Sequence, residues 1–308
     1  MRKPRVLREG DRIGLVAPAS PFARDGVEAG VAELRALGFE AVVDDAIFER
    51  TGYVAGSAEV RAAAFQRAWA DPSIAALIAM RGGFGSVQLL PILNCAPLVG
   101  AAKAFIGYSD NTSLLTWLTL QRGIVAFHGP MIEGRIAKGG AGYDRDSFRR
   151  CLCQAAPAGE FSTPGLTTLR PGEASGTLVG GTLTQLAGSL GTPFGFDPPG
   201  GSLFFFEDVN ERPYKIERLL TQLKYAGIFQ HAAGVIFGEM RGCSEIGGAI
   251  TVQGVIADFM ADFRGPVLFG FPSGHTTGPT FTLPLGVRTR IVADAQPRVI
   301  IEESAVEA

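Results

Sequence analysis

Short continuous runs of hydrophobic residues alternate with helix-spaced ones along the N-terminal part of the chain. Residues 74–80 form an almost continuous apolar run, which is typical of a strand buried on both faces. Residues 27–37 carry apolar side chains three or four positions apart, and this spacing predicts a helix that ends at Gly38. The same alternation predicts further strands at 13–17, 41–43, 104–106 and 124–127, and further helices at 58–70, around 87–93 and after residue 109.

This alternation predicts a three-layer α/β domain with a parallel sheet over residues 1–134. In such sheets, ligands gather at the carboxyl ends of the strands. Four features of the sequence fall at predicted strand ends, and we expect them to share one edge of the sheet: Pro18, Gly82–Gly83, Ser109 and His128.

The rest of the chain has a different pattern. Residues 135–173 are broken by glycine and proline around one predicted helix near 147–153, and we interpret them as the connection between two domains. Residues 174–308 are expected to form a strand-rich α+β or barrel-like domain, with helices at 184–190, 213–225 and 252–263. The short strands predicted in this domain lie at 176–179, 203–206, 234–237, 267–269, 283–285, 290–293 and 299–301.

Composition and charge narrow the class of protein. The 308 residues are 46% hydrophobic and 19% charged, with a formal net charge of −2, as in an ordinary folded globular protein. A nucleic acid or an anionic membrane surface would select a basic stripe, and the sequence has none. No run reaches the roughly eighteen apolar residues of a membrane span, and the N-terminal apolar segment is too short for a signal peptide. We expect a cytoplasmic protein whose four cysteines are reduced: Cys95, Cys151, Cys153 and Cys243.

Ser109 stands at the corner between a predicted strand and a predicted helix. Gly107 and Tyr108 lead into this corner, and the first N–H groups of the helix lie just behind it. That geometry exposes a hydroxyl nucleophile beside amide donors, where an oxyanion would form. On this stretch alone, the simpler interpretation is a helix N-cap, because serine is favoured at that position.

A serine nucleophile needs a histidine base, and the sequence has only three histidines. His275 lies in an exposed loop fixed by glycine and proline, which is where functional residues concentrate. His128 ends a strand on the ligand side of the first domain, so a role in the substrate pocket is also plausible. His231 has no neighbouring carboxylate or glycine-rich loop. The base therefore lies between His275 and His128, with His275 favoured.

The imidazole of such a base is oriented by a carboxylate. Glu207 leaves the end of the buried strand predicted at 203–206, where a carboxylate is well positioned. Asp208 should face the other way, and Glu211 lies at the start of a helix, so capping or solvated roles are more typical of both. The order Ser, acid, His is that of α/β-hydrolases, although the second glycine of their nucleophile elbow is missing here.

The segment from Arg81 to Gly85 is rich in glycine and follows a predicted strand. It lacks the third glycine of a dinucleotide fingerprint, and no Gly-Lys-Ser/Thr follows. We interpret it as a loop whose backbone approaches a substrate, so that Gly82 or Gly83 joins the N–H of Asp110 as an oxyanion donor. No group of His, Cys and carboxylates has metal-ligand spacing, so we predict no metal and no cofactor.

Several of these motifs together resemble the LD-carboxypeptidases, a family of serine peptidases that also includes the microcin C immunity peptidases. The resemblance runs from about residue 16 to about residue 285. The motifs that carry it are Gly107-Tyr108-Ser109-Asp110, Arg81-Gly82-Gly83-Phe84-Gly85, His128-Gly129-Pro130-Met131, Gly180-Gly181-Thr182-Leu183, Glu207-Asp208-Val209 with Arg212-Pro213-Tyr214, and Gly274-His275.

The resemblance implies a catalytic triad with Ser109 as nucleophile, His275 as base and Glu207 as its orienting acid. It also implies a flavodoxin- or class I amidotransferase-like N-terminal domain and a swivelling-barrel-like C-terminal domain. The resemblance further implies a homodimer whose active site lies between the two domains. The implied reaction removes the terminal D-Ala of a murein tetrapeptide by cutting an L,D amide bond, during cytoplasmic peptidoglycan recycling.

Two other functions stay open on the sequence. The immunity branch of the family cuts a nucleotide-peptide antibiotic and uses an aromatic side chain that stacks on the nucleobase. Trp69 and Trp117 occupy core-like helix positions here, which favours the murein substrate, although Phe148 or Phe161 could stack. The third function is a non-catalytic binding module in which Ser109 only caps its helix.

Two further points depend on the three-dimensional structure. The first is which cations read the substrate carboxylates, for which Arg81 and Arg212 lie near the motifs. The second is whether the nucleophile and the base, which lie in different predicted domains, meet only on domain closure.

Overall fold

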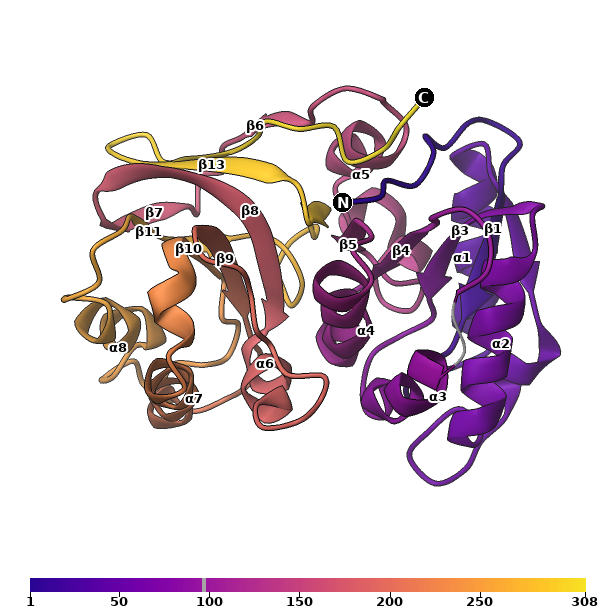
Figure 1. Cartoon of the computed structure of the whole chain (residues 1–308), viewed down its shortest axis with the longest axis horizontal. Helices are drawn as coiled ribbons and strands as arrows, with labels where there is room; N and C mark the ends of the chain where they lie inside the picture. The colour runs from indigo at the N-terminus through magenta and orange to yellow at the C-terminus, as the bar shows by residue number, and fades with distance from the viewer. Residues whose placement is uncertain (96–97) are drawn as a thin grey trace.

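Two β-sheets lie side by side in the computed structural model, each with helices packed against it (Figure 1). The structure describes residues 1–95 and 98–308, except for the side chain of residue 25. The N-terminal sheet and helices α1 to α4 occupy one half of the molecule, and the second sheet with α6 to α8 occupies the other (Figure 1). This confirms the predicted α/β fold with a parallel N-terminal sheet and a strand-rich C-terminal part.

The first sheet has six strands in the order β12-β5-β4-β3-β1-β2. Strands β1 to β5 are parallel, and β12 joins the edge antiparallel to β5. Every residue of β3 is buried, as its apolar run predicts. The bounds are β1 Arg12–Val16, β2 Glu40–Val43, β3 Ile74–Ala79, β4 Ala104–Gly107, β5 Ala126–His128 and β12 Leu283–Leu285.

The helices of this half follow the predicted pattern. Helix α2 begins after Ser57, whose side chain accepts a hydrogen bond from the backbone N–H of Val60, and ends before Asp71. A π-helical segment, Trp117–Gln121, continues α4. The bounds are α1 Asp25–Ala36, α2 Ala58–Ala70, α3 Leu90–Cys95 and α4 Thr112–Thr116.

The second sheet has eight strands in the order β6-β14-β13-β8-β9-β10-β11-β7. Its centre, β8 to β11, is parallel, and the outer strands are antiparallel to their neighbours. The bounds are β6 Gly159–Phe161, β7 Thr167–Arg170, β8 Gly172–Thr182, β9 Ser202–Glu207, β10 Ala232–Gly238, β11 Val267–Phe271, β13 Arg288–Ala293 and β14 Arg298–Ile301. The helices are α5 Arg145–Leu152, α6 Leu183–Ser189, α7 Pro213–Tyr225 and α8 Val252–Phe259.

Strand β9 divides its side chains between two apolar cores, as the two-residue period of a strand requires. Leu203 and Phe205 belong to the core shared with the first sheet. Phe204 and Phe206 belong to a second core, which contains buried residues of α6, α7 and α8. Glu207 continues the Leu203–Phe205 side of the strand, and Asp208 continues the other side.

Three segments differ from the prediction. The predicted connection contains β6 and β7 as well as the expected helix, and both strands pair into the second sheet. The predicted strand at 283–285 is present, but it extends the first sheet. Helix α8 ends at Phe259 rather than at residue 263. Strand pairing with distant residues decides the first two, and a local pattern does not carry that information.

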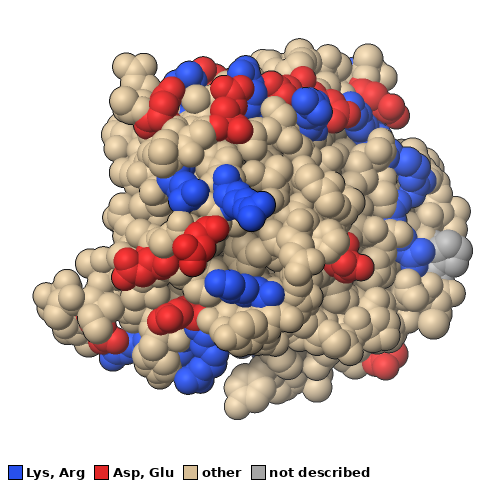
Figure 2. Space-filling model, turned by 60° about the vertical axis from the view of Figure 1, so that its left-hand side comes forward, with Lys and Arg blue, Asp and Glu red and all other residues tan. Residues whose placement is uncertain are grey.

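On the face that Figure 2 shows, side chains of both charge signs are present, and basic and acidic ones are mixed along the upper edge. Among residues 1–95 and 98–308, no helix is both long enough and apolar enough to cross a membrane.

Candidate active site

Ser109 lies two residues after the end of the buried strand β4 and begins a short 3₁₀ turn that leads into α4. Its φ is +63°, one of three positive φ values among the non-glycine residues that the structure describes. A non-glycine residue in this region is strained, and such strain concentrates at functional sites. A sharp strand-to-helix turn of this kind is also how nucleophile elbows expose a serine.

The glycine loop after β3 lies against this corner. A Cβ atom at Gly82 would lie 2.7 Å from the Cβ of Ser109 and 3.4 Å from the backbone N of Asp110, so only glycine fits there. The N–H groups of Gly82 and Gly83 donate to no acceptor within the described residues. Gly82 therefore lies beside the serine, and the N–H groups of Gly82 and Gly83 are unpaired among the described residues.

The side chains of Asp110 and Asn111 hold the Ser109 turn in place through hydrogen bonds. The Asp110 carboxylate is buried and accepts hydrogen bonds from the backbone N–H of Ser86 at 2.7 Å and from Gln185 at 3.3 Å. Burial raises the pKa of this carboxyl group. The Asn111 amide donates to the carbonyls of Arg81 and Tyr108, at 3.1 and 3.2 Å. These bonds hold the glycine loop and the serine turn in fixed register.

Glu207 and His275 form a hydrogen-bonded pair on the other side of the site. One carboxylate oxygen of Glu207, Oε2, is 2.8 Å from Nδ1 of His275 and accepts the His275 backbone N–H at 2.9 Å. The other oxygen, Oε1, accepts a hydrogen bond from the Thr182 hydroxyl at the end of β8. Only 1% of the Glu207 side chain is exposed, whereas His275 retains 15%.

The pKa of Glu207 is lowered below its usual range although the group is buried. Burial alone would raise it, but the nearby imidazoles of His275 and His128 and the hydrogen bonds from His275 outweigh that effect. A buried carboxylate with this many donors stays ionised and holds the facing imidazole in one orientation.

Gly274, directly before the histidine, has no room for a side chain. A Cβ atom there would lie 2.7 Å from the Glu207 carboxyl carbon and 2.8 Å from His128 Cε1, and its φ is +88°. Glycine is thus required for the loop to bring the His275 backbone against the acid. This gives a physical reason for the Gly274-His275 motif.

His128 lies behind Glu207 rather than in an open pocket. Its side chain is 0% exposed, with Nε2 3.8 Å from Glu207 Oε1 and Nδ1 2.9 Å from the Ser273 hydroxyl. Burial excludes the predicted contact with substrate in this conformation, because β12 pairs with β5 and Leu283 lies opposite His128. His128 is therefore a structural neighbour of the acid.

The other charged candidates, Asp208, Glu211 and Arg212, each have a hydrogen-bond or ion-pair partner away from His275. Asp208 accepts hydrogen bonds from the backbone N–H and the hydroxyl of Thr184, at 2.9 and 2.7 Å, so it caps α6 and faces away from His275, as predicted. Glu211, just before α7, pairs with Lys215 of that helix at 3.1 Å. Arg212 pairs with Glu245 at 2.8 Å.

Arg81 lies 3.2 Å from Glu133 and keeps 41% of its side chain exposed. It therefore remains available at the surface near the glycine loop. Among the described residues, no group of three or more His, Cys, Asp or Glu side chains is arranged to hold a metal ion. Burial raises the pKa of Cys153 and of Cys243 to about 11, so both thiols stay protonated at neutral pH.

Arg135 is a residue that the sequence analysis missed. Its guanidinium forms five hydrogen bonds, which link the His275 loop to the residue before the nucleophile. The acceptors are the carbonyls of Gly274 (2.9 Å), Thr276 (3.2 Å), Gly278 (3.0 Å) and Gly142 (3.3 Å), and the hydroxyl of Tyr108 (3.2 Å). The sequence gives no local signal for this role, because four of the five acceptors are backbone carbonyls and three of them lie in the distant His275 loop.

Tyr108 brings the two sides of the site together. Its ring meets the imidazole of His275 edge-on, with 5.0 Å between the ring centroids. Among the hydrogen bonds of the described residues, none joins the Ser109 hydroxyl to His275. The residue before the nucleophile thus contacts the base, but the Ser109 hydroxyl and His275 are not bonded in this conformation.

Comparison with known proteins identifies the family. The profile of the LD-carboxypeptidase N-terminal domain matches residues 13–129, and that of the LD-carboxypeptidase C-terminal domain matches residues 175–291. The chain belongs to the LD-carboxypeptidase family. It is accordingly a serine-type carboxypeptidase.

Individual relatives match this LD-carboxypeptidase over nearly its whole length. The probable murein peptide carboxypeptidase of Bacillus subtilis is 32% identical, over 99% of this chain and 96% of its own. The microcin C7 self-immunity protein MccF of Escherichia coli is 28% identical, over 96% and 95%. The crystal structure of muramoyltetrapeptide carboxypeptidase from Oxalobacter formigenes is 28% identical, with a TM-score of 0.82 over 94% of this chain and 97% of that one.

Proposed function

We propose that this LD-carboxypeptidase hydrolyses the L,D amide bond that releases the terminal D-Ala of murein tetrapeptides. The observation that carries the proposal is the bond between the Glu207 carboxylate and His275 Nδ1, 2.8 Å long, next to a serine in a strained turn. A binding module would have no chemical use for this combination. The murein substrate is supported by the names of the Bacillus and Oxalobacter relatives.

In this mechanism, the bond to Glu207 assigns the proton of His275 to Nδ1 and leaves Nε2 free as the general base. His275 Nε2 takes the proton of the Ser109 hydroxyl as its oxygen attacks the carbonyl before D-Ala. The oxyanion is stabilised by the N–H groups of Asp110 and of Gly82 or Gly83. His275 then protonates the leaving amine of D-Ala, and an acyl-enzyme remains.

Water completes the cycle by the same steps in reverse order. His275 removes a proton from the water molecule, which attacks the acyl carbonyl, and then returns the proton to Ser109. Glu207 stays ionised throughout and stabilises the imidazolium that forms twice in each turnover. Substrate binding would bring Ser109 and His275 to the roughly 2.6–3.2 Å that proton transfer needs, since such bonds often tighten only in the complex.

Aromatic side chains bear on the second candidate, cleavage of a nucleotide-peptide conjugate, as the MccF relative suggests. The four aromatic residues considered from the sequence are all buried: Trp69, Trp117, Phe148 and Phe161. Phe84, in the glycine loop, is 50% exposed and would be available to stack on a base. The murein substrate remains the proposal, and the conjugate is the comparison substrate.

The first test incubates the purified protein with a muramoyl tetrapeptide that ends in D-Ala and follows the products by mass spectrometry. Ser109→Ala and a processed microcin C-type conjugate run in parallel. We expect loss of one D-Ala with the wild type only. Cleavage of the conjugate alone would move the protein to the second candidate, and full activity of Ser109→Ala would overturn the mechanism.

Cytoplasmic murein recycling and a homodimer are also part of the proposal, and both rest on the family resemblance of the motifs. Size-exclusion chromatography with light scattering tests the assembly: a mass near twice the 32.4 kDa chain is expected, and a mass of one chain would contradict it.

A further inference from the structure

The mechanism above does not use one fully buried titratable group, the imidazole of His128. Its Nε2 atom has no hydrogen-bond partner within the described residues. That atom lies 3.8 Å from Oε1 of Glu207, which is too long for a hydrogen bond but within the range of an ion pair. Because buried polar atoms are normally paired, an unpaired ring nitrogen that faces a carboxylate calls for a physical reason.

The other ring nitrogen of His128 shows where one proton lies. Nδ1 is 2.9 Å from the Ser273 hydroxyl, and the same hydroxyl is 2.9 Å from the backbone carbonyl of Phe281 and 3.5 Å from that of His128 itself. The hydroxyl has a single proton, and a carbonyl can only accept. When the hydroxyl donates to a carbonyl, Nδ1 must be the donor to Ser273. The charge of His128 then depends on whether Nε2 also carries a proton.

The charge of Glu207 favours a proton on Nε2. Within the described residues, the ion-pair neighbours of this buried carboxylate are His128 and His275, and Thr182 donates a hydrogen bond but brings no charge. A buried carboxylate without a compensating charge is costly, and a bare lone pair on Nε2 would add to the repulsion. In the resting enzyme His275 has to be neutral, because a general base needs a free lone pair. His128 is then the cation that compensates the charge.

The other groups around His128 are consistent with this charge. The Tyr108 ring lies 6.0 Å away between centroids, and burial raises the pKa of its hydroxyl, so the phenol is neutral. Phe205 packs edge-on against the imidazole at 5.0 Å and is apolar. The Arg135 guanidinium donates its hydrogen bonds to backbone carbonyls and to Tyr108, and it forms no ion pair with Glu207.

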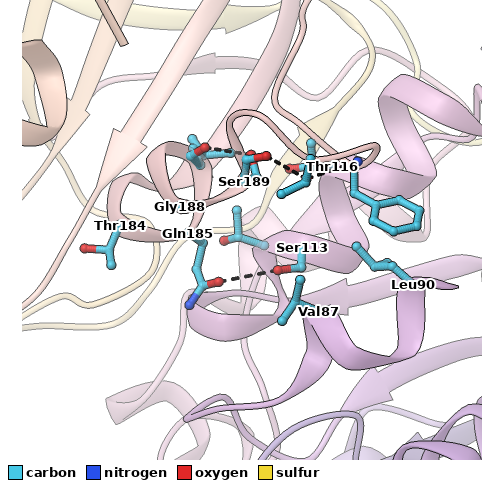
Figure 3. Close-up of a pocket in the computed structure, with 12 residues that line it drawn as sticks. Val87, Leu90, Ser113, Thr116, Thr184, Gln185, Gly188 and Ser189 are labelled. Carbon is cyan, nitrogen blue, oxygen red and sulfur yellow. Dashed lines mark hydrogen bonds between the residues drawn. The ribbon is translucent and has the colours of Figure 1, made fainter. Parts of the chain in front are cut away.

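Neither charged group borders the cavity that lies between the two halves of the molecule. This cavity, of about 260 Å³, lies between α4 and α6, where the Ser113 hydroxyl is bonded to Gln185 (Figure 3). Among its lining residues within the described parts of the chain, none is His128 or Glu207. The two side chains are only 0% and 1% exposed, so each has the other, rather than bulk water, to offset its charge.

We infer that His128 is a positioning residue: in the resting enzyme it is an imidazolium that balances the charge of Glu207 through Oε1, while His275 binds Oε2. The inference rests on the proposed function, because it concerns the base of that reaction. A balanced Glu207 still accepts the Nδ1–H of His275 and orients the ring. It attracts a second proton to His275 less strongly, so the base stays neutral and ready to act at lower pH.

Nitrogen-15 NMR of the full-length protein tests the charge without any substrate. The chain has only three histidines, so the ring signals of His128 are assigned by their loss in His128→Gln. At pH 7 we expect both ring nitrogens of His128 to be protonated, and His275 to be neutral with its proton on Nδ1. A neutral His128, as either tautomer, would overturn the inference even if D-Ala is released. A charged His128 would support it even if no peptide is cleaved.

The pH profile of D-Ala release tests the consequence for the base. His128→Gln removes the charge and keeps an amide that can bond Ser273. The acid limb of kcat/KM should move up by about one pH unit, so activity at the acid end falls roughly tenfold and recovers at higher pH. His231→Gln is the matched control, since His231 precedes β10 at the opposite end of the sheet from Glu207. A loss equal at every pH, or an unmoved acid limb, would contradict the inference.

Discussion

Ser109 and Glu207 both lie at the carboxyl ends of buried parallel strands, but they are held in place by different means. The nucleophile is fixed by its own turn: a positive φ, a glycine loop against it, and the side chain of Asn111. The acid and base are fixed by groups from distant segments, chiefly Thr182 and Arg135.

This difference predicts which substitutions should disturb each side of the site. The serine side stores strain locally, and Asp110 accepts only a long hydrogen bond from Gln185 of the second domain, so this side should be less sensitive to changes there. The acid–base side depends on charge and on hydrogen bonds across the interface, so removal of one partner should affect the geometry of the others. Four predictions use this contrast, and they are ordered from the largest expected effect to the smallest.

The acid is expected to give the largest effect. Glu207→Gln keeps the shape but removes the charge that stabilises the imidazolium and selects its tautomer. Loss of an equivalent carboxylate costs about 10⁴-fold in a serine protease, so we expect kcat to fall about 10³–10⁴-fold. Steady-state D-Ala release measures it, with Glu211→Gln as the surface control. A loss below tenfold would show that the base does not need this acid.

Arg135 should come next. Arg135→Ala removes five hydrogen bonds and frees the His275 loop, and a displacement near 1 Å can cost about 10²-fold in rate. We expect kcat to fall roughly 10- to 100-fold, with partial recovery when guanidinium is added, and little recovery for Arg135→Lys, which lacks the planar fork.

Arg145→Ala is the matched control for Arg135, because Arg145 bonds Glu33 at the surface. Activity of Arg135→Ala equal to that of this control would contradict a positioning role. A loss of activity that guanidinium does not restore would indicate general unfolding, which circular dichroism would detect.

The pH dependence of stability should distinguish Asp208 from its neighbour Glu207. Burial raises the pKa of Asp208 to about 6, despite its hydrogen bonds with Thr184. The folded state therefore keeps a proton that the unfolded state releases near pH 4, so stability falls as the pH rises from about 4 to 6 and levels off above that. The shift corresponds to on the order of 2–3 kcal/mol.

Asp208→Asn should remove this pH dependence. The free energy of unfolding would be measured by urea titration between pH 4 and 8. The value for the variant minus that for the wild type should rise by about 2–3 kcal/mol as the pH increases across that window. The exposed Asp294→Asn should show no such trend. A flat difference for Asp208→Asn would mean that Asp208 ionises normally.

The smallest effect is the change in stability expected when the strained serine is replaced. Ser109→Gly should abolish activity yet raise the free energy of unfolding by about 0.5–1 kcal/mol, since glycine adopts positive φ without a steric cost. Asn210→Gly is the control, because Asn210 has a φ of +57° and asparagine already tolerates that region. An unchanged or lower stability of Ser109→Gly would remove the argument for local strain.

Much of the fold could be predicted from the sequence because its strands and helices follow simple periods. The bounds of α2 and α7 match the hydrophobic pattern, and the two-residue period of β9 explains why Glu207, and not Asp208, faces the histidine. Strand β12 could not be placed, because three residues of local sequence do not say which sheet edge they will join.

Part of the site could also be predicted, because some of its residues lie in locally recognisable turns. Ser109 and His275 stand in turns whose glycines mark them locally. His128 also ends a strand, but its burial depends on β12, which lies about 150 positions further along the chain. Arg135 binds mainly backbone carbonyls. Because every residue has a backbone carbonyl, no sequence motif predicts this role.

The central claim is that Ser109 and His275 act in one reaction, and a double-mutant cycle tests it most directly. D-Ala release from muramoyl tetrapeptide would be measured for Ser109→Ala, His275→Ala and the double variant. Residues that act as a unit are strongly non-additive, so each single change should cost nearly as much as both together. If the two losses multiply instead, the serine and the histidine act independently, and the proposed triad is wrong.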